Sequence, residues 1–137
     1  MSTYELKIRV RYSETDQMGV VYHGNYAQYF EVGRAEAIRN LGISYKDMEI
    51  MGVKMPVVEM HTQFIRSAQY DDLITIKTQL RELPQQHKIE FHHEVYNERK
   101  KLLTIGRVVL YFIQIETKEK VSMPPAFISK LAPFFTL

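Results

Sequence analysis

A short polar segment, residues 13–24 (SETDQMGVVYHG), brings together side chains that could do chemistry. Glu14, Asp16 and His23 lie in it, directly before a predicted helix. The first turn of a helix offers unpaired backbone N–H groups and the positive end of the helix dipole, which stabilise a developing oxyanion. A carboxylate such as that of Asp16 could act as a base or a nucleophile toward a carbonyl group bound there.

A purely structural interpretation of the same segment is equally compatible with the spacing. Asp16 could close an Asx-turn, and His23 could be an ordinary surface histidine. Gly19 and Gly24 would permit a tight loop in either case, and they would also let a ligand approach the backbone closely. Spacing alone therefore leaves both interpretations open.

Two other kinds of site are excluded by their spacing. The two glycines of the segment have P-loop spacing, but Asn25 and Tyr26 follow where Lys and Ser or Thr are required, which excludes nucleotide hydrolysis of that type. His92 and His93 are adjacent on a predicted strand, so their side chains point to opposite faces and cannot share a metal ion. We therefore expect no metal site.

A long amphipathic helix is predicted directly after the polar segment, over residues 25–41. Apolar or small side chains recur there at three- and four-residue steps and share one helical face: Tyr26, Tyr29, Phe30, Gly33, Ala37 and Leu41. Asn25 is the expected N-cap, with Gln28 reaching back as in a capping box. Gly42 can end the helix in the left-handed conformation, and Gly33 would let a strand approach.

Most of the remaining chain alternates apolar and polar residues, which is typical of strands. Such strands are expected over residues 5–12, 58–64, 74–80, 89–95 and 102–115, with short helices over 44–51 and 126–131. No helix separates the last four strands, so parallel crossovers are unavailable and the sheet should be antiparallel. The long helix must bury its apolar face on that sheet. The sequence thus predicts a single α+β domain over residues 1–137.

Composition limits the class of protein further. With 137 residues, 45% hydrophobic and 25% charged, the chain suits one globular domain. The absence of Cys excludes disulfides, Cys-ligated metals and a thiol nucleophile. A net charge of +2 with interspersed signs argues against a nucleic-acid partner. No apolar run reaches the about 20 residues that span a membrane, and no signal peptide begins the chain, so we expect a cytoplasmic protein.

The run from Tyr12 to Tyr26 (YSETDQMGVVYHGNY) resembles the hotdog-fold acyl-CoA thioesterases, especially the branch of 4-hydroxybenzoyl-CoA thioesterase and the YbgC-type enzymes. The shared pattern is Asp-x-x-Gly-aliphatic-Val-Tyr-His-x-x-Tyr, and residues 70–74 (YDDLI) also resemble the family. The resemblance implies a hotdog fold, a curved antiparallel sheet wrapped around one long central helix. It further implies hydrolysis of acyl-CoA or acyl-carrier-protein thioesters without a cofactor, by a homodimer or homotetramer.

The resemblance also assigns roles to single residues. Asp16 matches the catalytic carboxylate, acting as nucleophile or as general base on water, and the sequence does not decide between the two. His23 matches the helix-start residue whose backbone N–H polarises the thioester carbonyl, and its imidazole is a further candidate contact for substrate or Asp16. Gly19 would permit the tight loop. The acyl pocket would be lined by Val20, Val21 and Tyr26.

Two alternatives to a thioesterase stay open, a hotdog dehydratase or hydratase and a non-catalytic acyl-CoA-binding module. A hotdog dehydratase or hydratase would carry a different histidine-bearing motif, which is not found in this sequence. Asp16 argues against the binding module, because a passive site needs no carboxylate beside an electron-rich thioester. Candidate contacts for the phosphates of coenzyme A are Arg66, Arg81, Lys88 and Arg107. Glu31 and Arg34 are expected to form an intrahelical or interface ion pair, and Asp72 to cap or order the turn before its strand.

Overall fold

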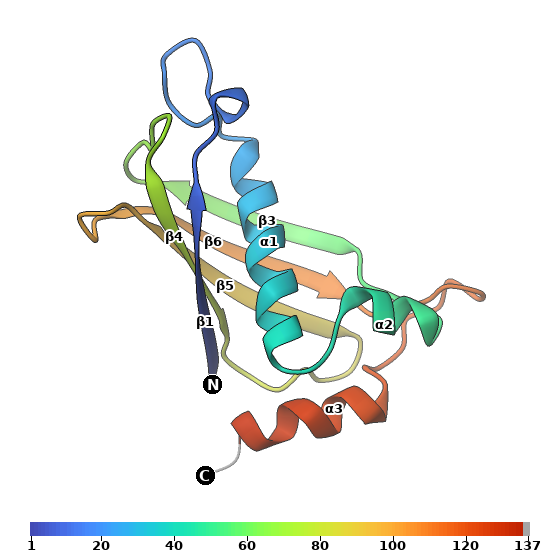
Figure 1. The fold of residues 1–137 in the computed structure, drawn as a ribbon. Coiled ribbons are helices and arrows are strands. Elements are labelled where there is room, and N and C mark those ends of the chain that lie inside the picture. The colour runs from blue at the N-terminus through green and yellow to red at the C-terminus, as the bar shows by residue number, and fades with distance from the viewer. Residues whose placement is uncertain (136–137) are drawn as a thin grey trace.

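The computed structural model describes residues 1–135 and contains seven strands with three α-helices (Figure 1). Two 3-10 turns, η1 and η2, complete the regular elements. In chain order the elements are β1 (Ser2–Arg9), η1 (Tyr12–Glu14), α1 (Asn25–Asn40), α2 (Tyr45–Ile50), β2 (Val53–Lys54), β3 (Val57–Phe64), β4 (Leu73–Leu80), β5 (Lys88–Tyr96), β6 (Leu102–Tyr111), β7 (Ile113–Gln114), α3 (Pro125–Leu131) and η2 (Ala132–Phe134).

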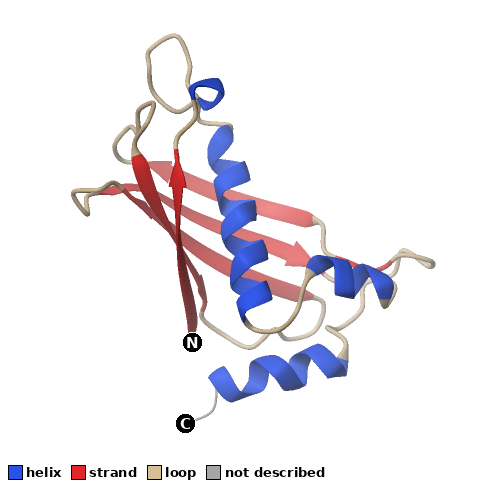
Figure 2. Ribbon diagram, in the orientation of Figure 1, coloured by secondary structure: helices blue, strands red, loops and turns tan. Residues whose placement is uncertain are grey.

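Five strands form one antiparallel sheet in the order β1-β4-β5-β6-β3, and α1 lies across one face of it (Figures 1 and 2). The short strands β2 and β7 pair separately. This arrangement confirms the predicted α+β class, because every pairing in the large sheet is antiparallel. None of the helices within residues 1–135 is long and apolar enough to span a membrane.

Two glycines let α1 approach the sheet closely. A Cβ atom on Gly33 of α1 would collide with the Thr78 hydroxyl of β4, and a Cβ atom on Gly106 of β6 would collide with the Phe30 ring. Phe30 is fully buried and stacks on His93 of β5, with 4.6 Å between the ring centroids. The close approach predicted for Gly33 is confirmed, and it fixes α1 over the centre of the sheet.

The start of α1 differs from the prediction. Gly24, not Asn25, precedes the first helical residue, and no side chain caps the helix there. The amide of Asn25 instead donates to the carbonyl of Glu14 at 2.8 Å, so its side chain ties the helix to η1. At the other end, Gly42 has a φ of +92°, as predicted for the residue after the helix.

Three strand predictions also need correction or refinement. The expected strand 102–115 is interrupted at Phe112, which lies between the end of β6 and the start of β7. The side chain of Phe112 is fully buried. Tyr12 lies in η1 with 79% of its surface exposed, rather than on the buried face of the first strand. Strand β3 has no buried residue on either face, because it lies at the sheet edge opposite β1, whereas α1 packs over β1, β4 and β5.

Candidate active site

The loop between η1 and α1 forms a tight turn around Asp16. The backbone N–H of Asp16 donates to the carbonyl of Val20 at 2.9 Å, and that of Gly19 donates to the carbonyl of Asp16 at 3.0 Å. Gly19 has a φ of +78°, a conformation that glycine adopts at little cost. Thr15 and Val21 pair as an antiparallel bridge that closes the loop. Backbone contacts therefore hold Asp16 at the turn.

The carboxylate of Asp16 has one oxygen engaged and one free. Its Oδ1 accepts a hydrogen bond from the backbone N–H of Met18 at 2.8 Å, which is the Asx-turn of the structural interpretation. Its Oδ2 has no hydrogen-bond partner within residues 1–135, and the residue is only half-buried. The turn and a chemical role are therefore compatible, because the second oxygen can still meet water or a substrate.

The first turn of α1 offers unpaired backbone donors. Asn25 N donates to the carbonyl of Tyr22 at 2.9 Å, and Tyr26 N donates to that of His23 at 3.3 Å. The backbone N–H groups of His23 and Gly24 have no acceptor in the described part of the chain, and both residues are exposed. Such donors at a helix N-terminus can bind the oxygen of a polarised carbonyl group.

Aromatic rings surround this helix start. The His23 ring lies 4.3 Å from that of Tyr22 and 6.3 Å from that of Phe64, measured between centroids. Tyr26 is buried, with edge-on contacts to Phe64 at 5.5 Å and to Tyr29 at 5.6 Å. Burial raises the pKa of the Tyr26 phenol, so it stays protonated at neutral pH. The site therefore has an apolar wall beside its polar donors.

The two predicted valines follow Asp16 along an extended segment. Val21 is buried and donates its N–H to the carbonyl of Ala68 at 2.8 Å. Val20 is half-buried and forms an antiparallel bridge with Gln69. All six predicted site residues thus lie on the loop or the first helical turn, and residues 68–69 support them from the β3–β4 connection.

Glu14 is a buried acid at this site to which the sequence assigned no role of its own. It is 5% exposed, and its carboxylate accepts hydrogen bonds from Arg11 and from the Tyr29 hydroxyl. Burial by itself raises the pKa of the Glu14 carboxyl, but these hydrogen bonds outweigh it and the pKa lies below 4.5. No sequence signal revealed the contact, because Tyr29 lies 15 positions away on another element.

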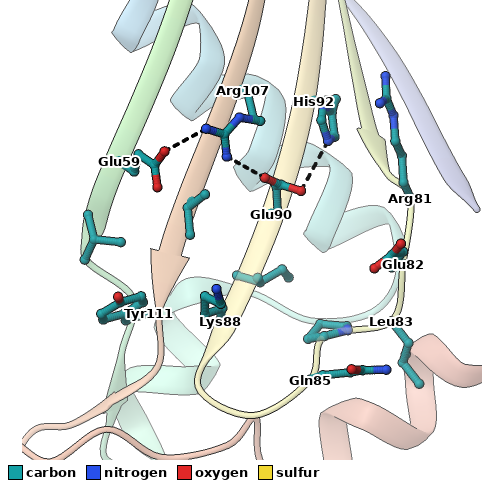
Figure 3. Close-up of a pocket in the computed structure, with 14 residues that line it drawn as sticks. Glu59, Arg81, Glu82, Leu83, Gln85, Lys88, Glu90, His92, Arg107 and Tyr111 are labelled. Atoms are coloured by element: carbon teal, nitrogen blue, oxygen red, sulfur yellow. Dashed lines mark hydrogen bonds and ion pairs between the residues drawn. The ribbon is translucent and has the colours of Figure 1, made fainter.

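A cavity of about 570 Å³ lies on the sheet face away from α1 (Figure 3). Side chains along β5 alternate between the two faces of the sheet, and this identifies the face on which the cavity lies. Phe91 and His93 are buried on the helix side, whereas Glu90 and His92 line the cavity. None of the six predicted site residues lines it. Within residues 1–135, no three His, Asp or Glu side chains group closely enough to hold a metal ion.

Three of the four basic residues offered for phosphate binding line this cavity, namely Arg81, Lys88 and Arg107. Arg107 is already bound by Glu59 and Glu90, each at 2.6 Å (Figure 3), so its charge is neutralised. Arg66 lies elsewhere and donates to the carbonyl of Leu102 at 3.2 Å. Of the four candidates, Arg66, Arg81 and Lys88 pair with no carboxylate within the described residues, and of these Arg81 and Lys88 line the cavity.

Two structural predictions near the site have opposite outcomes. The intrahelical ion pair between Glu31 and Arg34 is wrong, because Arg34 is only 5% exposed and lies beside Tyr45, without pairing to Glu31 in residues 1–135. An ion pair of these residues across an interface stays a prediction. The turn role of Asp72 is confirmed, since its Oδ2 accepts from the N–H of Gln69 at 2.8 Å.

Comparison with known proteins identifies the relatives of this chain. The family model of the thioesterase-like superfamily matches residues 10–131. The chain is 38% identical to YneP of Bacillus subtilis (strain 168), over 71% of this chain and 70% of YneP. It is 24% identical to the acyl-CoA thioester hydrolase YbgC of Escherichia coli O6:H1, over 90% and 91% of the two chains.

A solved structure shows that the fold is shared as well. The DHNA-CoA thioesterase of Staphylococcus aureus superimposes with a TM-score of 0.92 at 33% identity. The match covers 98% of this chain and 92% of that one. The hotdog arrangement expected from the sequence is therefore confirmed.

Proposed function

The chain belongs to the thioesterase-like superfamily, and we propose that it is an acyl-CoA thioesterase that hydrolyses the thioester of acyl-CoA, or of acyl carrier protein, to a free acid and a thiol. One observation supports this most strongly. Asp16, with a free Oδ2, lies on the same closed loop as the unpaired N–H groups of His23 and Gly24. A carboxylate and an oxyanion site are the two parts that thioester hydrolysis needs.

In this proposal the backbone N–H groups at the start of α1 bind the thioester oxygen and stabilise the negative charge that forms on it. Asp16 either removes a proton from the attacking water or attacks the carbonyl carbon itself, giving an anhydride that water then opens. In both routes the C–S bond breaks, the thiolate leaves and is protonated, and a carboxylic acid remains. Neither route requires a cofactor, because the sulfur leaving group already activates the carbonyl.

The remaining predicted residues have supporting roles. Val20, Val21 and Tyr26 would line the acyl pocket, and Gly19 would let the turn keep Asp16 in place. The imidazole of His23 is exposed and lies against Phe64, so it is placed to touch a bound acyl group. These assignments draw support from the position of all five residues on one loop and helix start.

A thioester panel tests the proposal. Purified protein is mixed with benzoyl-CoA, hexanoyl-CoA, palmitoyl-CoA and an acyl carrier protein thioester, and thiol release is followed with a chromogenic disulfide. We expect turnover of at least one thioester. Binding of acyl-CoA without thiol release would instead favour a binding module, and hydration of enoyl-CoA without thiol release would favour a hydratase.

We also propose that the protein works as a dimer paired through β3. This outer strand exposes apolar side chains on both faces, including Val58 at 46%, Met60 at 46% and Phe64 at 52%. An exposed apolar edge strand is a ready template for a second strand, and a second copy of this chain supplies one. Because Phe64 also touches the rings of His23 and Tyr26, the partner would lie beside the site.

Replacing Met60 by Glu tests this assembly. The side chain is exposed, so the change should spare the fold of the monomer while placing two charges in the paired edge. We expect light scattering to report a monomer and thioesterase activity to fall at least about tenfold. Ile50 lies on α2 and is 74% exposed, so Ile50→Glu provides the control variant. We expect this control to keep the oligomeric mass and the activity of the wild type. A monomeric, fully active wild type would contradict the proposal.

A further inference from the structure

Glu14 lies where the two ends of the candidate catalytic loop meet. Its backbone carbonyl accepts the N–H of Tyr22 at 2.9 Å and the side-chain amide of Asn25 at 2.8 Å. Tyr22 directly precedes His23, and Asn25 is the first residue of α1. Two residues after Glu14 the chain reaches Asp16. One residue thus joins the entry and the exit of the loop.

The carboxylate of Glu14 fixes that junction to buried parts of the fold. Oε1 accepts the backbone N–H of Arg11 at 2.8 Å and the hydroxyl of Tyr29 at 2.9 Å. Oε2 accepts the guanidinium of Arg11, from Nη2 at 2.9 Å and from Nε at 3.2 Å. Tyr29 lies on the second turn of α1 and is only 2% exposed, so it offers a rigid anchor.

All four donors require an acceptor, and only a carboxylate provides acceptors on both of its oxygens. A glutamine of the same shape would direct an NH₂ group at a donor, either the Arg11 guanidinium or the Tyr29 hydroxyl. The Tyr29 hydroxyl is buried and could not easily turn to water instead, whereas the side chain of Arg11 is exposed and could do so. A carboxylate at position 14 is therefore the side chain that accepts from all four donors at once, and its charge holds the Arg11 guanidinium at the junction.

We propose that Glu14 is a positioning residue, which holds the loop of Asp16 and His23 against α1 in the geometry that hydrolysis requires. The proposal rests on the proposed thioesterase function for its kinetic consequence, but the loop order that it describes can be measured without turnover. Glu14 itself need not touch the substrate, because its carboxylate oxygens are already occupied by Arg11 and Tyr29.

The chain offers a matched control in Glu94. Its carboxylate also accepts a tyrosine hydroxyl, from Tyr96 at 2.9 Å, and lies 3.9 Å from a cation, the ammonium of Lys77. Glu94 is on β5, with its side chain on the sheet face away from α1, and it has no contact with the loop. Glu14→Gln and Glu94→Gln therefore remove the same kind of interaction, one at the loop and one remote from it.

Hydrogen–deuterium exchange provides the first measurement, at a temperature where every variant is folded. In Glu14→Gln we expect the amides of Asp16, Gly19 and Tyr22 to exchange at least about tenfold faster, because their hydrogen bonds close the loop. Amides of β4 and β5 should keep their wild-type rates, which a general loss of stability would not allow. Glu94→Gln should leave the loop amides unchanged.

Steady-state kinetics on whichever thioester of the panel is cleaved provide the second measurement. Because small displacements of catalytic groups cost up to about 100-fold, we expect kcat of Glu14→Gln to fall about 10- to 100-fold. KM should change less than about threefold, since the loop displacement affects the reacting groups and not the remote binding contacts. Tyr29→Phe removes one of the four donors and should lower kcat in the same way but by less. This variant takes the place of Glu14→Gln if Glu14→Gln does not fold.

The outcomes are separable. Wild-type loop exchange and wild-type kcat in a folded Glu14→Gln protein would overturn the positioning role. Faster loop exchange in a protein whose wild type cleaves no thioester would support the positioning role and contradict the proposed function. Equal kinetic losses in Glu14→Gln and Glu94→Gln would also overturn it, because they would reflect stability alone.

Discussion

Replacing Asp16 by Asn separates the chemistry of the carboxylate from its place in the turn. Oδ1 of Asp16 accepts the N–H of Met18 at 2.8 Å, and the amide oxygen of an asparagine can accept the same bond. The two backbone bonds between Asp16 and residues 19–20 do not involve the side chain. The variant therefore loses the negative charge and the nucleophilic oxygen while the turn stays closed.

The expected magnitude follows from the role. A positioned base contributes about 10²- to 10⁴-fold to a rate, so kcat for thioester hydrolysis should fall at least about 100-fold, or about 2.7 kcal/mol of barrier height. KM should change less than about threefold, since Oδ2 would act mainly in the transition state. The free energy of unfolding should change by less than about 0.5 kcal/mol, because Asn is also favoured in such turns.

The assay compares thiol release by the wild type and by Asp16→Asn over a range of acyl-CoA concentrations, with thermal unfolding measured in parallel. Asp72→Asn is the matched control, since Asp72 also accepts a backbone N–H in a turn, from Gln69 at 2.8 Å. The control should keep wild-type kcat. Hydrolysis by Asp16→Asn at the wild-type rate would refute the catalytic assignment and leave Asp16 as a turn residue.

His23→Ala should reduce kcat less than Asp16→Asn does in the same thiol-release assay, because the backbone N–H survives the truncation; equal losses would indicate an imidazole acting as acid or base. Burial and the nearby charge of Arg34 lower the pKa of His93 from 6.5 to about 3, so unfolding titrations should show stability falling by on the order of 4 kcal/mol as pH drops through that range. A His93→Gln variant should lose most of this dependence of stability on pH. Gly106→Ala should lower stability by about 1–3 kcal/mol in chemical denaturation, since its Cβ would strike the Phe30 ring.

Protonation of His93 destabilises the folded chain at low pH. The unfolded chain binds a proton at this histidine below pH 6.5, whereas the folded chain does so only near pH 3, because the side chain is buried beneath α1. The unfolded state therefore gains protons between these values, and folding becomes less favourable as the pH falls. Above about pH 7 the histidine is mostly uncharged in both states, so it adds no pH dependence to the folding free energy there.

Local periodicity in the sequence was sufficient for most of the fold. Alternation from Ile74 to Leu80 predicts β4, and in the structure Ile74, Ile76, Thr78 and Leu80 are all buried, as the pattern requires. The three- and four-residue spacing after Asn25 predicts α1, whose buried face includes Tyr26, Tyr29 and Phe30. The antiparallel sheet followed from the lack of helices between the last strands.

The candidate site was also largely within reach of the sequence. The loop and the helix start are consecutive in the chain, so Asp16, Gly19 and His23 could be grouped from spacing and from the family resemblance together. What spacing did not decide was whether Asp16 closes a turn or does chemistry. The structure places Oδ1 in the turn and leaves Oδ2 free, which makes the two roles compatible.

Only the tertiary structure decided the features that depend on distant partners. The alternation of β3 predicts a half-buried strand, yet both faces are exposed because α1 packs over β1, β4 and β5 at the other side of the sheet. A strand's own sequence does not say which strands a helix covers. The intrahelical pair expected of Glu31 and Arg34 is absent from the described residues, since packing buries Arg34 beside Tyr45.

Glu14 gives the same lesson at the site itself. Its residue type and its place in a polar segment suggest a solvated acid, and its burial arises from contacts with Tyr29 and Arg11 that form only when η1 meets α1. The sequence by itself thus determined which segments form helices and strands and which loop holds the candidate site, because these depend on neighbours within a few residues. Edges, buried charges and the anchoring of the loop were decided by packing, because they depend on which surfaces meet in three dimensions.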